Sequence, residues 1–499
     1  MKIVNPSKMQ IRKSNHPIRF IIFMFGISCL IAKEPDIHRT ELIQLKLTKK
    51  QHNELTAMKI EFATGLLDSL ALAVVTEAEL AVIEERGYAV EKIMHRDCEV
   101  DLFKRALYGE AMTLDPIYHT YSEVVDELKT LVQKHPGLIK VEKIGRTSQG
   151  GRDIRAAKIS DHVNTSEDEP AILFSGAIHS DEVAGVEICM ALINHLLSRY
   201  GEDQQVTGWV DEYEIWLVPV INVDGHYVVT SGIDPRWRKN TRDNNSNGIL
   251  YEKGDGIDLN RNFSYNWAHG GSSDSSSSRY RGEAPFSETE CAAVRDLVLE
   301  QQFLLSVTYH SQGEVIYFPW DWRGRKAPDD KLLRRIANGL AGSIRTLKGD
   351  TTYAAHYGAG TVGQTYPWMY GAAGTLDFVV ETGKGRHIFP PGDLKKIVES
   401  NLQGAFYMLE QMEGPGLIGR ITDARTGKPL SAEVWLPDID TDDVHRRSSN
   451  KEFGRYRRLL EPGRYRLIIS KDGYQTLILK NIEIKKSGWT TLDIRLKKD

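Results

Sequence analysis

The chain has 499 residues, of which 41% are hydrophobic, so it is long enough for two or three domains with ordinary packed cores. Its formal net charge of −4 shows no basic excess, which argues against nucleic acid as its main partner.

The N-terminus is typical of a secretory signal. Basic residues precede an apolar run at positions 20–32, which is too short to cross a bilayer comfortably, since a spanning helix takes about 20 residues. We therefore expect residues 1–32 to be a signal peptide, with no stable membrane span and a secreted or periplasmic location. An uncleaved anchor is the alternative. Cleavage would leave three cysteines, Cys98, Cys189 and Cys291, and this odd number is not a disulfide framework.

Residues 40–97 are expected to form a small separate unit. Alternation and helical spacing predict five elements, at 42–47 (strand), 49–58 (helix), 70–75 (strand), 77–86 (helix) and 88–93 (strand). This β-α-β-α-β order suits a compact α/β module, either propeptide-like or accessory. Apolar residues on one face of 121–133 predict the first helix of the domain that follows, which we place at 113–412.

A candidate metal pair lies between a strand and a helix. Residues 171–177 are an apolar run that predicts a buried strand, and apolar positions from 183 to 197 recur at roughly helical spacing. His179 and Glu182 lie in the loop between them, at the edge where open α/β sheets place their ligand sites. Imidazole and carboxylate together suit zinc, and a catalytic zinc site keeps three protein ligands.

Two arginine-containing segments follow the strand expected at 214–220, and they hold Arg238 and Arg261. A guanidinium group matches a carboxylate through two parallel hydrogen bonds. Beside a zinc site, these arginines would suit a substrate with a free carboxylate near the scissile bond. The alternative is that both are surface arginines in polar loops. The serine-rich stretch at 272–278 is expected to be a flexible surface loop.

Two later strands are expected to end in residues that can serve the same site. The apolar run 303–311 carries His310 at its end, and the run 375–381 ends in Glu381. If these strands lie parallel to the first, His310 emerges at the same edge as His179. A histidine that only caps its strand is the alternative. A carboxylate ending a buried strand is costly unless it is paired or used.

A second domain boundary is expected at 414–416, where glycine and proline interrupt the chain. Beyond it, short strands with turn signals are predicted at 417–422, 432–436, 454–459, 464–470 and 482–485. Regular short strands of this kind indicate a β-sandwich at 414–499.

These motifs, taken in order, resemble the zinc metallocarboxypeptidases of the carboxypeptidase A/B type from about residue 118 to about residue 412. The matching segments are 118–121, 144–148, 176–182, 222–225, 237–239, 258–262, 280–282, 310–311 and Glu381. Segments at 419–423, 426–430 and 462–465 resemble the transthyretin-like domain that follows many regulatory carboxypeptidases. The resemblance implies an α/β fold in which helices flank a mixed β-sheet, with a small N-terminal α/β module and a C-terminal β-sandwich.

The resemblance also implies a role for each matching residue. His179, Glu182 and His310 match the ligands of one Zn²⁺ ion per chain. Glu381 matches the general base, which takes a proton from zinc-bound water and returns it to the leaving amine. Arg238 matches the group that polarises the scissile carbonyl and stabilises the oxyanion.

Substrate-binding residues are implied in the same way. Asn260 and Arg261 match the pair that binds the terminal carboxylate, and Asp258 matches a carboxylate that orients a zinc-bound imidazole. The family has a mobile tyrosine that closes over the terminal carboxylate. Tyr357 is our choice for it and Tyr366 is the rival, because the segment between them does not align cleanly.

The implied activity is zinc-dependent hydrolysis of the C-terminal peptide bond of peptides or proteins. Two enzymatic alternatives use the same scaffold: a peptidoglycan peptide hydrolase and an N-acyl amino acid deacylase. A non-catalytic binding homologue is a third, disfavoured by the complete ligand set and base. The sequence leaves open the preferred C-terminal residue and the oligomeric state.

Overall fold

A computed structural model describes residues 40–58, 60–62, 70–94, 114–248, 250–252, 254–358 and 362–499. The chain divides into two compact units, residues 1–100 and 101–499. The signal expected at 1–32 lies outside the described residues and stays a prediction. Among the described residues, no helix is both long and apolar enough to cross a bilayer.

The first unit contains the expected α/β module. Its elements are β1 (Thr40–Lys46), α1 (Lys49–Ala57), β2 (Glu61–Phe62), β3 (Leu70–Thr76), α2 (Glu77–Glu85) and β4 (Val90–Met94). The strands form an antiparallel sheet in the order β2-β3-β1-β4. The sequence pattern predicted three of these strands but not the short edge strand β2. Ile43, Leu45, Leu55 and Ile83 form part of its own small core.

The second unit is built on an eight-stranded mixed sheet in the order β13-β10-β14-β9-β7-β8-β6-β5. The strands are β5 (Ile139–Arg146), β6 (Asp153–Ile159), β7 (Ala171–Ser175), β8 (Glu214–Val218), β9 (Leu305–His310), β10 (Val315–Phe318), β13 (Ala354–Tyr357) and β14 (Leu376–Glu381). The central strands β14, β9, β7 and β8 are parallel. Every residue of β7, β8 and β9 is buried, which explains their almost continuous apolar sequences.

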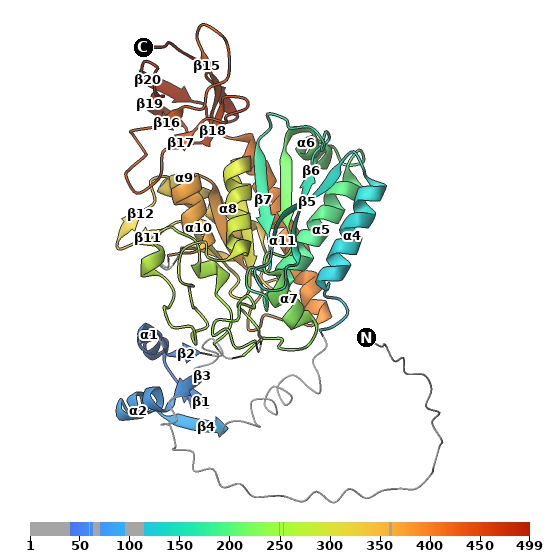
Figure 1. Ribbon diagram of the computed structural model, residues 1–499, viewed down its shortest axis with the longest axis vertical. Helices are drawn as coiled ribbons and strands as arrows, with labels where there is room; N and C mark the ends of the chain where they lie inside the picture. Colours follow the sequence, from blue (N-terminus) through green and yellow to red (C-terminus); the bar gives the residue numbers. More distant parts are fainter. Residues whose placement is uncertain are drawn as a thin grey trace, which may run out of the picture. The chain divides into compact units, whose positions relative to one another are not determined.

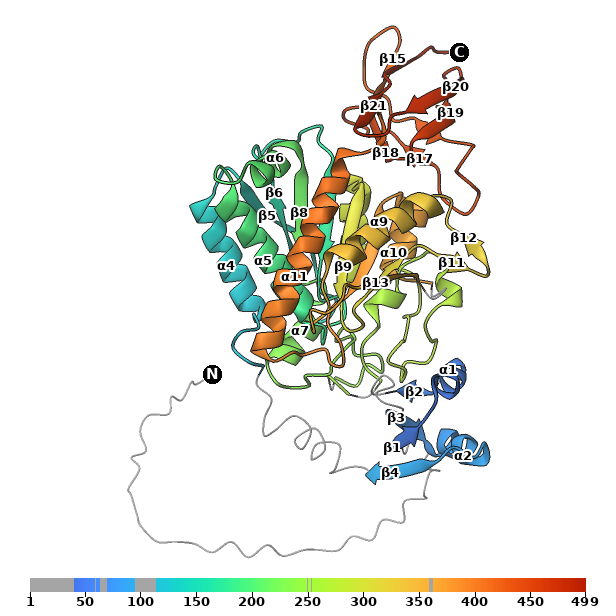
Figure 2. The ribbon, with the colours of Figure 1, turned by 180° about the vertical axis from the view of Figure 1, so that it is seen from behind.

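Helices cover both faces of this sheet, as expected (Figures 1 and 2). They are α4 (Tyr121–Lys134), α5 (Ala184–Arg199), α6 (Gln204–Glu212), α7 (Val223–Thr230), α8 (Thr289–Gln301), α9 (Asp330–Ser343), α10 (Thr365–Trp368) and α11 (Pro391–Glu410). Helices α5 and α11 lie side by side on one face, and α8 lies on the other. This arrangement confirms the predicted fold class.

A half-buried ion-pair cluster joins α4 to α5. The Nδ1 atom of His119 lies 2.7 Å from Glu187, and its Nε2 atom lies 2.9 Å from Glu127. Hydrogen bonds to Glu127 and Glu187 raise the pKa of His119 to about 10. This imidazole is therefore a cation at neutral pH and holds the two helices together.

The C-terminal residues form two packed sheets with their own core. The strands are β15 (Gly416–Asp423), β16 (Glu433–Trp435), β17 (Arg447–Ser448), β18 (Arg455–Leu459), β19 (Gly463–Ser470), β20 (Leu477–Ile484), β21 (Trp489–Thr491) and β22 (Ile494–Leu496). One sheet has the order β18-β15-β21 with β22 also on β15, and the other has the order β17-β16-β19-β20. Leu417, Ile421, Leu467 and Ile484 contribute to the core between them.

Ion pairs connect this sandwich to the eight-stranded domain. Asp168 accepts from Arg420 at 2.8 Å, Arg455 at 2.7 Å and Arg457 at 2.9 Å. The sandwich therefore has a core of its own, while its Val444 and Leu459 join the core of the eight-stranded domain, and the two form one compact unit. Burial opposes these contacts, but the three arginines prevail and lower the pKa of Asp168.

Candidate active site

Three adjacent parallel strands bring the predicted metal ligands and base to one edge of the sheet. His310 and Glu381 are the last residues of β9 and β14, and they are direct register partners. His179 and Glu182 lie in the loop between β7, the other neighbour of β9, and α5. The expectation that these strands run parallel is thus confirmed, and it explains why residues far apart in sequence meet.

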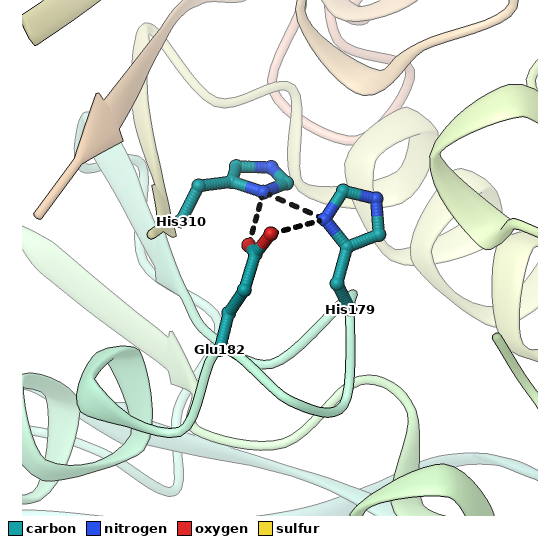
Figure 3. Close-up of side chains that lie close together, drawn as sticks. All are labelled: His179, Glu182 and His310. Atoms are coloured by element: carbon teal, nitrogen blue, oxygen red, sulfur yellow. Dashed lines mark hydrogen bonds and ion pairs between the residues drawn. The ribbon is translucent and has the colours of Figure 1, made fainter. Parts of the chain in front are cut away.

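His179, Glu182 and His310 point toward one another (Figure 3). The Nδ1 atom of His179 lies 2.9 Å from Glu182 Oε1, and that of His310 lies 2.7 Å from Glu182 Oε2. The two Nδ1 atoms are 3.1 Å apart. All three residues are at most 3% exposed. Two nitrogen donors and a carboxylate that face one point make a donor set that suits zinc.

The outer nitrogens of both imidazoles are held by neighbours. The Nε2 atom of His179 lies 3.2 Å from Asp258 Oδ1, as expected of a carboxylate that orients the ring. The Nε2 atom of His310 lies 3.2 Å from Asn260 Nδ2, while Asn260 Oδ1 accepts from the backbone of Thr365. The structure therefore places Asn260 against His310 as well as beside Arg261.

The two predicted arginines lie in different surroundings. Arg238 donates through Nε and Nη2 to Asp258 Oδ2 at 3.3 and 3.2 Å, and its Nη1 lies 3.4 Å from Glu182. Burial opposes its charge, but Asp258 and Glu182 raise the pKa of Arg238. Arg261 is only 7% exposed, and burial lowers its pKa. Neither residue is an ordinary surface arginine.

Glu381 is partly buried beside the predicted metal ligands. Burial, reinforced by the negative charge of Glu182, raises the pKa of Glu381 to about 8, against the opposing effect of His179, His387 and Arg238. A bound metal cation would favour the ionised form. A carboxyl group with a pKa near the working pH can both accept and donate a proton, as a general acid–base group must.

His387 and Asp181 were not predicted, yet they form part of this site. His387 Nδ1 lies 2.6 Å from Asp181 Oδ2, and the two residues cluster with Glu182. Burial opposes the charge of the imidazole, but Asp181 raises the pKa of His387 to about 9. The only sequence signal was the position of Asp181 beside Glu182, because His387 belongs to the irregular segment after β14.

The two candidate tyrosines have different surroundings. Tyr357 is partly buried at the end of β13, where its hydroxyl donates to Asp330 at 2.5 Å. Tyr366, on α10, is 3% exposed and its hydroxyl packs against Gly358, where an added Cβ would lie 1.9 Å away. Burial lowers the pKa of Arg261, and Tyr366 acts against this lowering. Tyr366 is therefore held in a packed position, whereas Tyr357 is the more exposed of the two.

Sequence comparison places these residues in a known context. The family model described as zinc carboxypeptidase matches residues 124–404, and the carboxypeptidase regulatory-like domain matches residues 416–497. Mouse carboxypeptidase A2 is 30% identical over 322 residues, which cover 64% of this chain and 68% of the relative. The inactive metallocarboxypeptidase ECM14 of Saccharomyces cerevisiae is 27% identical over 330 residues, which cover 62% of this chain and 72% of that protein.

The structural comparison agrees on the fold. The crystal structure of carboxypeptidase A from Helicoverpa armigera superposes with a TM-score of 0.59 and 20% sequence identity, covering 76% of this chain and 98% of that one. At this identity the likeness concerns the architecture alone. The chemistry has to be argued from the side chains at the sheet edge.

Proposed function

Because the chain belongs to the zinc carboxypeptidase family, we propose that it hydrolyses the C-terminal peptide bond of peptides or proteins. One relative is described as inactive, so family membership alone does not decide that the chain is an enzyme. The observation that carries the proposal is the meeting of a complete ligand set, His179, Glu182 and His310, with Glu381 on the neighbouring strand.

His179, Glu182 and His310 would hold one zinc ion, which supplies Lewis-acid polarisation and acidifies water when bound. Glu381 accepts a proton from the attacking water and returns it to the departing amine. Arg238 presents a guanidinium group, fixed by Asp258, that stabilises negative charge on the carbonyl oxygen.

Arg261 and Asn260 would bind the substrate's terminal carboxylate. The guanidinium of Arg261 is buried, so a carboxylate that reaches it forms a contact with little screening. Tyr357 remains our candidate for the closing side chain, because it is only partly buried at a strand end, whereas Tyr366 is packed beneath Gly358. Tyr366 would instead be a fixed neighbour of Arg261.

The test is amino acid release from a matched pair of peptides that differ only at the C-terminus. The zinc-loaded protein should release the last residue from a peptide with a free carboxylate. It should leave the same peptide with a C-terminal amide nearly intact, because Arg261 then has no anion to bind. Equal turnover of both peptides, or cleavage of neither, would contradict the proposal.

A further inference from the structure

The serine-rich loop, residues 271–281, is tied to the rest of the domain by hydrogen bonds from its own backbone and from a lysine of another segment. The backbone N–H of Ser272 donates to the carbonyl of Arg279 at 2.8 Å, which closes the base of the loop. Lys239 Nζ donates to the carbonyls of Ser275 at 3.2 Å and Ser277 at 3.4 Å. The lysine ammonium therefore connects the loop to a different segment of the chain, and the Ser277 carbonyl also accepts from the N–H of Tyr280 at 3.2 Å.

This loop is attached to the active site at its other end. The N–H of Asp258 donates to the carbonyl of Tyr280 at 2.8 Å. A Cβ added at Gly271, which has a φ of +61°, would lie 2.8 Å from the carbonyl oxygen of Arg279 and 3.2 Å from Arg261 Cβ. The backbone of Gly271 thus packs between Arg279 and Arg261, and the loop presents Arg279 next to the carboxylate-binding residue.

Arg279 differs from its neighbours in lacking a counter-charge. Arg238 is neutralised by Asp258 and Glu182. In the part of the chain that the structure describes, no acidic side chain forms an ion pair with Arg279, and the residue is exposed. Burial lowers the pKa of Arg261, and the positive charges of Arg238 and Arg279 lower it further. Because Gly271 packs against both the Arg279 carbonyl and the Arg261 side chain, the two arginines are close neighbours in the fold.

We propose that Arg279 is a specificity-determining residue that favours substrates whose C-terminal residue carries a second carboxylate, aspartate or glutamate. The inference rests on the proposed function. Arg261 binds the main-chain carboxylate, which leaves Arg279 available for the side-chain carboxylate. A dianionic C-terminus also relieves the repulsion between two neighbouring cations, and arginine can bind a carboxylate through two parallel hydrogen bonds.

The test compares two peptides that end in glutamate or in its neutral isostere, glutamine. The zinc-loaded wild-type protein should have the higher kcat/KM for the glutamate peptide. Arg279→Gln should lower kcat/KM for that peptide by about fivefold, the factor given by about 1 kcal/mol for a solvent-accessible ion pair. Its kcat/KM for the glutamine peptide should stay within about twofold, because the lost contact involves only the side-chain charge.

Two further variants sharpen the result. Arg279→Glu should reverse the preference, and Arg425→Gln should change neither peptide, because Arg425 is an exposed arginine on a turn of the C-terminal sandwich. An equal effect of Arg279→Gln on both peptides would overturn the inference while leaving the proposed function intact. Cleavage of neither peptide by the wild-type protein would overturn both.

Discussion

Asp258 contacts both the proposed metal ligand His179 and Arg238, so its replacement gives a specific prediction. The residue is fully buried. One carboxylate oxygen lies 3.2 Å from His179 Nε2 and accepts from the backbone of Asn260, while the other accepts from two nitrogens of Arg238. Asp258→Asn preserves the shape of the side chain but removes the negative charge that both neighbours use.

The size of the effect follows from these contacts. Residues that orient a metal-bound imidazole typically change metal affinity about 10- to 100-fold when they are replaced. Arg238 would also lose its main counter-charge and be left with Glu182, 3.4 Å away, which is itself a metal ligand. We therefore expect the zinc dissociation constant to rise about 10- to 100-fold, and kcat to fall even when zinc is saturating.

The assay is competition for zinc between the protein and a chelator of known affinity, followed by peptide turnover at saturating zinc. Asp255→Asn is the matched control, because Asp255 is nearly as buried and, among the residues the structure describes, its carboxylate accepts from the backbones of Asn244 and Glu252 rather than from a histidine or an arginine. Asp255→Asn should affect thermal stability but not zinc affinity. A zinc dissociation constant for Asp258→Asn within about twofold of wild type would refute the reasoning.

Three other predictions concern stability and substrate closure. His119→Gln should lower the melting temperature at pH 6. Because the pKa of His119 is raised to about 10, its stabilising effect is complete below about pH 6.5 and is lost as the pH passes about 10. The difference in melting temperature between variant and wild type should therefore shrink over this pH range. Asp168→Asn leaves three arginines without their anion and should lower the free energy of unfolding by about 3 kcal/mol at neutral pH. Because the pKa of Asp168 is lowered, this contribution is present above about pH 4 and disappears as the pH falls further. Urea unfolding of variant and wild type at pH 7 and at pH 3 would measure the difference. Tyr357→Phe should raise KM about three- to tenfold with little change in melting temperature, whereas Tyr366→Phe should mainly lower the melting temperature; the opposite pattern would identify Tyr366 as the closing residue.

The strand ends of this protein could be predicted because their chemistry and their hydrophobic pattern are both local. Strands β7, β9 and β14 are short, apolar and fully or almost fully buried, so their ends are easy to locate. His310 and Glu381 each follow such a run directly. Once the strands are taken to be parallel, their meeting with His179 follows from geometry.

Other parts of the site depend on contacts that no local pattern encodes. His387 belongs to an irregular segment and acquires its role only through Asp181, which is 206 positions away in the sequence. The serine-rich loop has a composition typical of flexible chain, and its contact with Lys239 comes from a different segment. In both cases the deciding interaction is a long-range contact of a charged side chain, which neither periodicity nor composition can reveal.

Glu381→Gln tests the central claim most directly. Glutamine has almost the same shape as glutamate but cannot carry the proton from water to the departing amine. The variant should keep about one zinc ion per chain and the wild-type melting temperature, while kcat for a free-carboxylate peptide falls by about 10²- to 10⁴-fold or more. A kcat near that of the wild type, with zinc bound, would contradict the account and require the base to be sought elsewhere along the carboxyl edge of the sheet.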